Sequence, residues 1–233
     1  MSVNDLVLVQ GVRDTRTTLA RWNRDPWPVL RAWVFGSLSV AACLLLAVWA
    51  VASNSPVDLT SMYVPGLDNE AALGDVAAIL ARNSLVLALH ATACVAGFIA
   101  GSSLALSAAQ RTGVSRWVHE RARPVAVAWV VLVTCFSLVT QAYALGLTGA
   151  QLANQFELSP AALMLTVVPH AVPELVAVFL PLAAWTIASR RDEWDELMAA
   201  TLTTVVVAVP ILIAAATWEV YAWPRILAGA SGI

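Results

Sequence analysis

Charged residues are scarce in this chain. They account for 12% of its 233 residues, whereas 60% are hydrophobic and the mean hydropathy is +0.76. A typical soluble domain is about one quarter charged. This scarcity excludes an ordinary soluble domain and predicts an integral membrane protein, whose first partner is the lipid bilayer.

Several chemical signatures are also missing. Lysine is absent and the thirteen arginines form no dense basic tract, so we expect no nucleic-acid partner. Cys43, Cys94 and Cys135 fall in separate apolar runs, without the spacing of a metal site or a disulfide framework. The chain also lacks the His-Glu-x-x-His motif, the Gly-x-Ser-x-Gly nucleophile motif and an ATP-binding loop. We therefore expect no enzymatic activity, no metal and no cofactor.

What the sequence does contain is five long apolar runs, at about 30–52, 83–109, 124–147, 161–188 and 198–223. Each is long enough to cross a bilayer as an α-helix, which needs about 20 residues. We predict an all-α fold, a polytopic membrane bundle of five transmembrane helices over residues 30–228. Residues 1–29 precede it as a cytoplasmic N-terminal segment.

The arginines predict the orientation of the bundle. They are concentrated in residues 1–29, in the loop over residues 110–123 and at Arg190 and Arg191, and these segments alternate with arginine-poor loops. Loops rich in arginine stay on the cytoplasmic side. We therefore expect a cytoplasmic (plasma) membrane protein with a cytoplasmic N-terminus and an external C-terminus.

Two further patterns, of apolar and of small residues, concern the packing of helices. Before the second run, apolar residues at 73, 76, 77 and 80 predict a short external amphipathic helix over residues 69–81, lying on the membrane or capping the bundle. An ordinary surface helix fits the same spacing. Within the second run, small residues recur at every fourth position, at Ala93, Gly97, Gly101 and Ala105. Such a face lets another helix approach closely, either a neighbour in the chain or a second copy in a homodimer.

The fourth run contains the most unusual stretch, Pro169-His170-Ala171-Val172-Pro173-Glu174. His170 and Glu174 are four residues apart, so on a helix they share one face. Near the middle of a bilayer an ionisable side chain costs about 2.5 kcal/mol or more unless a partner or water satisfies it. Pro169, Pro173 and Pro181 each remove a backbone donor, so we predict that this helix is kinked or broken.

Polar side chains on the other runs lie at similar depth. They place a candidate intramembrane site in the outer half to the middle of the bilayer, and its members are Asn83, His90, Gln141, His170, Glu174 and Glu219. Three interpretations stay open. The groups form a hydrogen-bond network that fixes helix register, a cavity or transport site, or a metal site of two histidines and two glutamates, as in an intramembrane hydrolase.

Two motifs resemble those of one known family. Pro169–Leu175 resembles the Pro-His-Gly-x-x-Glu-Leu signature of the stage II sporulation protein M family, also called the DUF95 family, with Ala171 in place of its glycine. Trp218–Pro224 resembles its later Ile-Glu-Ala-Phe-x-Thr-Pro motif. Asn83 and the glycines of the second run also resemble that family, so the resemblance covers about residues 80–228.

This resemblance implies a function. In endospore formers such a protein is a polytopic membrane component that helps to organise peptidoglycan-degrading partners during engulfment. It implies a non-enzymatic scaffold or assembly factor that binds other membrane or cell-envelope proteins. The alternative, suggested by the buried His170 and Glu174, is a transporter, channel or permease subunit.

The predicted topology is testable by labelling. In a chain whose three native cysteines are replaced, single cysteines at Gly146 and Arg116 should react with a membrane-impermeant thiol reagent from opposite sides of the membrane. Labelling of both positions from the same side would contradict the five-span topology.

Overall fold

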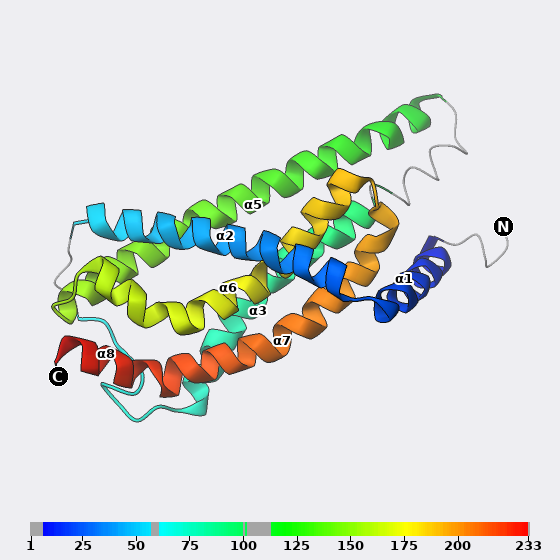
Figure 1. Cartoon of the computed structure of the whole chain (residues 1–233). Helices are drawn as coiled ribbons and strands as arrows, with labels where there is room; N and C mark the ends of the chain where they lie inside the picture. The colour runs from blue at the N-terminus through cyan, green and yellow to red at the C-terminus, as the bar shows by residue number, and fades with distance from the viewer. Residues whose placement is uncertain (1–6, 57–60, 100, 102–112, 233) are drawn as a thin grey trace. The chain divides into compact units, whose positions relative to one another are not determined.

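The computed structural model of the chain describes residues 7–56, 61–99, 101 and 113–232 (Figure 1). Its helices are α1 (Val7–Arg24), α2 (Trp27–Asn54), α3 (Leu73–Phe98), α5 (Gly113–Gln155), α6 (Pro160–Arg191), the 3-10 helix η3 (Trp194–Glu196), α7 (Leu197–Tyr221) and α8 (Trp223–Ser231). Five of them are long and apolar enough to cross a membrane. The predicted all-α membrane fold is therefore confirmed.

The second span differs from the prediction. The segment over residues 69–81 is no separate helix, because α3 starts at Leu73 and continues to Phe98. Asp75 caps its start, since the Asp75 carboxylate accepts the Ala72 N–H at 3.0 Å. Neither glycine nor proline interrupts the chain between Asp75 and Ala96, so the amphipathic turns and the apolar turns form one helix.

Two other helices are longer than the apolar pattern suggests. For residues 1–29 the sequence predicts only a cytoplasmic N-terminal segment, but Val7–Arg24 form the amphipathic helix α1. α5 begins at Gly113 rather than at residue 124, with Pro124 inside it. α1 is a helix separate from α2, whereas α5 extends its apolar run towards the N-terminus. In both cases polar residues are helical, which an apolar run does not report.

α6 is one uninterrupted helix from Pro160 to Arg191. Pro169, Pro173 and Pro181 therefore do not break it. Of the two predicted outcomes, a kinked or a broken helix, the broken helix is wrong. Each proline lacks a backbone N–H, so the carbonyls of Leu165, Pro169 and Ala177 receive no helical hydrogen bond from it. The remaining helical hydrogen bonds hold the segment together.

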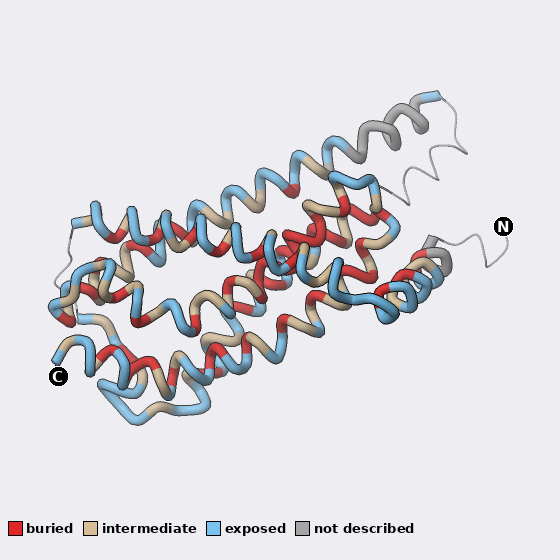
Figure 2. Tube along the Cα trace, viewed as in Figure 1, coloured by how far each residue is buried: buried red, intermediate tan, exposed pale blue. Residues whose placement is uncertain are grey.

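The chain divides into two compact units, and the five long helices each contribute to both. The first unit comprises residues 1–37, 87–134 and 179–207. In it, residues 179–185 of α6 are all buried, so this part of α6 is covered on every side (Figure 2). Trp22 of α1 and Trp33 of α2 meet edge to face, with ring centroids 5.1 Å apart.

Small residues of α3 let this first unit close tightly. A Cβ at Gly97 would lie 2.8 Å from Leu197 and from the Trp185 indole, and one at Gly101 would collide with Trp194. The partners of this face are thus helices of the same chain. Ala93 is also buried, whereas Ala105 lies outside the described residues.

The second unit comprises residues 38–86, 135–178 and 208–233. One of its cores unites Val64, Ala153, Phe156, Leu163, Trp223 and Leu227. The segment that contains Val64 is fixed by a side chain of α5, because the Gln155 amide accepts the Met62 N–H at 2.7 Å and donates to the Met62 carbonyl at 3.0 Å. The connection between α2 and α3 is therefore bound to the end of α5.

Gly146, one of the two labelling positions above, is not at the end of its helix, because α5 continues to Gln155. A Cβ at Gly146 would lie 2.5 Å from the Cβ of Val51 on α2. Glu157, which is exposed in the turn after α5, is therefore the better external labelling position.

The same contact predicts a stability difference between two identical substitutions in α5. Gly146→Ala should destabilise the protein by about 1–3 kcal/mol, the usual cost of overpacking. Gly149→Ala is the matched control, because its Cβ would lie 3.7 Å from Ala52, an ordinary contact. It should be neutral or stabilising by about 0.5–1 kcal/mol. Thermal unfolding in detergent measures both, and equal midpoints would contradict the packing of α5 on α2.

Candidate functional site

Side chains from three helices of the second unit form a polar group. Glu174 of α6 faces the Asn83 amide of α3, and it interacts electrostatically with Glu219 of α7 and with Arg82 of α3. Glu219 interacts with Arg82 as well. Both carboxylates therefore lie within electrostatic range of the Arg82 guanidinium, and we call Arg82, Asn83, Glu174 and Glu219 the acidic cluster.

Helix geometry explains how α3 supplies two different members. Adjacent helical residues point about 100° apart, so Asn83 is 6% exposed while Arg82 is exposed. Both carboxylates are partly buried. The acidic residues thus lie partly within the protein, whereas Arg82 is on the exposed side of α3.

The acidic cluster is not fully paired. Among the described residues, no ion pair within 4.0 Å joins Arg82 to Glu174 or Glu219. The Asn83 amide nitrogen faces Glu174 but makes no hydrogen bond of standard geometry with the described protein atoms. Two acids near one cation, without a direct ion pair among them, form an arrangement that can take up a proton or a small cation. A closed structural network would satisfy each of these groups directly.

His170 does not join the acidic cluster as its spacing suggested. Its ring lies against Trp223, with centroids 5.8 Å apart and planes inclined by 60°. The Trp223 indole in turn donates to Thr166 at 3.1 Å. His170 Nδ1 is buried without a hydrogen-bond partner in the part of the chain that the structure describes. No hydrogen bond from His170 to Glu174 is seen there, although both lie on α6.

The remaining predicted residues have other surroundings. Gln141 donates to Ser137 Oγ at 2.9 Å, one turn earlier on its own helix. His90 belongs to the first unit, where its ring meets Phe179 edge to face at 5.2 Å. The structure thus brings together Asn83, Glu174 and Glu219. The sequence-based analysis missed Arg82, whose only signal was its position directly before Asn83.

A metal centre finds no support in these surroundings. Within the described ranges, no three His, Cys, Asp or Glu side chains are grouped as metal ligands would be. The acidic cluster offers two carboxylates and an amide, which are oxygen ligands suited to a hard cation, but Arg82 competes for the same oxygens. We assign no metal to it.

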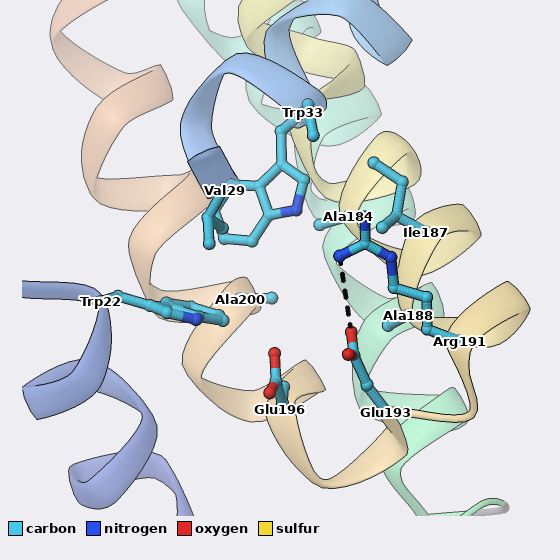
Figure 3. Close-up of a pocket in the computed structure, with 11 residues that line it drawn as sticks. Trp22, Val29, Trp33, Ala184, Ile187, Ala188, Arg191, Glu193, Glu196 and Ala200 are labelled. Atoms are coloured by element: carbon cyan, nitrogen blue, oxygen red, sulfur yellow. Dashed lines mark ion pairs between the residues drawn. The ribbon is translucent and has the colours of Figure 1, made fainter. Parts of the chain in front are cut away.

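A second polar site lies in the first unit, where α1 meets α6 and α7. Arg21 of α1 forms an ion pair with Glu196, and Arg191 faces Glu193 at 4.0 Å. Figure 3 shows these acidic residues beside Trp22 and Trp33 around a pocket of about 30 Å³. That volume holds little more than one or two water molecules. The contact therefore serves to hold α1 in place.

Known families offer a direct comparison. The family model described as Stage II sporulation protein M matches residues 125–224. This region includes the motifs at Pro169–Leu175 and Trp218–Pro224, so the resemblance that they suggested is confirmed. Residues 80–124 lie outside the match. No curated protein and no solved structure gave a significant match.

The acidic cluster predicts opposite effects for two substitutions of Glu174. Glu174→Gln removes the repulsion from Glu219 and keeps an oxygen facing Asn83, so stability should be unchanged or slightly higher. Glu174→Ala removes that oxygen together with the methylenes of a partly buried side chain, and should cost about 1–3 kcal/mol. Thermal unfolding of the purified protein compares them, and equal loss in both variants would contradict the geometry described for Glu174.

Proposed function

We propose that this chain, which over residues 125–224 belongs to the stage II sporulation protein M family, is a non-enzymatic membrane subunit that assembles with another cell-envelope protein. We further propose that it resides in the plasma membrane with its N-terminus in the cytoplasm. The family match supports a membrane protein of this kind, and the assembly role is what the resemblance described above implies. One feature of α5 supports a protein partner in particular.

α5 is the least buried of the five spans. Large apolar side chains recur along it at alternating steps of four and three residues, and each is 60–68% exposed: Val125, Trp129, Leu132, Phe136, Val139 and Tyr143. We call these six residues the α5 seam. Their repeat is seven residues, which keeps one line of side chains facing a second helix as the two wind around each other.

One exposed face of any helix repeats at steps of three and four residues, but lipid contact alone does not require a large side chain at each of these steps. Acyl chains are fluid, so an exposed helix needs apolar side chains but no fixed spacing among the large ones. A partner helix does need that spacing, because each large side chain must enter a hole between the partner's residues. The α5 seam therefore supports a transmembrane helix of another protein as its occupant. The helix-packing glycines of α3 are already occupied within the chain.

A second candidate function follows from the acidic cluster. Glu174 and Glu219 share Arg82 without a direct ion pair, and ionisable groups at membrane depth often mark transport pathways. A transporter or permease subunit would use these carboxylates to carry a proton or a cation. In that case Glu174→Gln should abolish transport at normal protein abundance, whereas a scaffold should keep its partner with glutamine at this position.

The α5 seam predicts site-specific crosslinking in cells. A photoreactive amino acid at Phe136 should give a covalent adduct with one other membrane protein, because this side chain lies in the seam. Leu85 of α3, which is 74% exposed outside the seam, is the matched control and should give none. Gel shift and mass spectrometry of the adduct provide the measurement.

Three outcomes would contradict the proposed assembly. They are adducts of equal yield at both positions, adducts with lipid alone, and an adduct that contains two copies of this chain.

A further inference from the structure

α1 is amphipathic, but its apolar side is already used inside the protein. Trp22 is buried against Trp33, and Thr18 is buried as well. Gly11 lies so close to Phe98 that an added Cβ would be 2.9 Å from its ring. A free amphipathic helix would place this side in the bilayer. Here the arginine-bearing side remains exposed, and the helix is attached to the first unit.

The attachment of α1 leaves a groove beside it. The groove has a volume of about 200 Å³ and lies between α1 and the first turns of α2, with α7 contributing one residue. Its apolar walls include Leu19, Pro26 and Leu30, and its polar residues are Asn23 and Thr203. Pockets for whole drug-sized ligands are about 300–1,000 Å³. This groove therefore suits part of a molecule, such as one stretch of an acyl chain.

The groove lies where a membrane span begins. Only two residues separate the end of α1 at Arg24 from the start of α2 at Trp27. Trp27 is 73% exposed, as is usual for tryptophan at the boundary between headgroups and acyl chains. Leu30 and Trp33 belong to the first two turns of that span. An apolar groove at this level is adjacent to lipid.

The segment that lines most of the groove is rich in arginine. Residues 13–31 contain five arginines and two aspartates. Arg21 is occupied by Glu196, while Arg16, Arg24 and Arg31 are exposed. Arg24 follows Asn23 of the groove directly, and Arg31 follows Leu30. The charge near the groove thus complements an anionic headgroup, and each arginine near a membrane surface contributes to such binding.

We propose that this groove binds an anionic phospholipid. One acyl chain lies along the apolar wall formed by Leu19, Pro26 and Leu30, and the headgroup phosphate is held by Arg24 and Arg31 beside Asn23. α1 then acts as one side of a lipid site in addition to being part of the fold. The proposal is independent of the function proposed for α5 and of the acidic cluster.

Native mass spectrometry of the purified full-length chain tests the site. The protein is titrated in detergent with dioleoyl phosphatidylglycerol or, separately, dioleoyl phosphatidylcholine. Wild-type protein should prefer the anionic lipid. Arg24→Gln/Arg31→Gln should bind it on the order of 30-fold more weakly, from the contribution typical of two arginines at a membrane surface. Thr203→Phe, which fills the groove without changing charge, should lower the occupancy of both lipids.

Arg225→Gln is the control for charge, since Arg225 is exposed on α8 far along the chain from the groove. It should bind both lipids as wild type does, and its thermal midpoint and those of the groove variants show that all are folded. Equal binding of the two lipids by wild type, or unchanged binding in the double arginine variant, would overturn the proposal. So would equally tight binding of water-soluble glycerophosphoglycerol, because a headgroup alone would then suffice without the groove.

Discussion

A polar group inside a bilayer must find its partner within the protein, and this requirement governs the structure at every level. The backbone meets it by forming helices, since a helix satisfies its own donors and acceptors. Short hydroxyl side chains meet it locally too, because Ser37, Thr186, Thr204 and Thr217 each donate to the carbonyl four residues earlier. These residues need no help from another helix. The burial of Ser37 and Thr204 therefore carries little information about function.

Carboxylates cannot be satisfied in this way, because an ionised acid accepts but does not donate. Glu174 and Glu219 require donors or cations from other helices, and α3 supplies them through Asn83 and Arg82. The acidic cluster therefore ties α3, α6 and α7 of the second unit together. A purely structural solution would be a direct ion pair with each acid, yet Arg82 stays more than 4.0 Å from both. This incomplete pairing distinguishes the cluster from a polar network that only joins helices.

The sequence predicted the number of spans because a membrane imposes a length on every apolar run. It could not predict α1 or the first turns of α5, whose polar residues continue a helix for reasons of local propensity and tertiary contact. The site was predicted in part. Depth along each helix selected Asn83, Glu174 and Glu219, but depth carries no information on the direction in which a side chain points. Gln141 and His170 lie at similar depth and turn to Ser137 and Trp223 instead.

Arg82 shows the opposite error. In the sequence it lies directly before the second predicted run, where a long charged side chain usually extends to the interface. Once α3 is known to begin at Leu73, Arg82 lies in its third turn, at the level of Asn83. α3 thus starts about ten residues before the second predicted run, which makes Arg82 part of this helix and the cation of the acidic cluster. The cluster therefore depends on the length of α3, which is set by the Asp75 cap and the absence of glycine and proline after it.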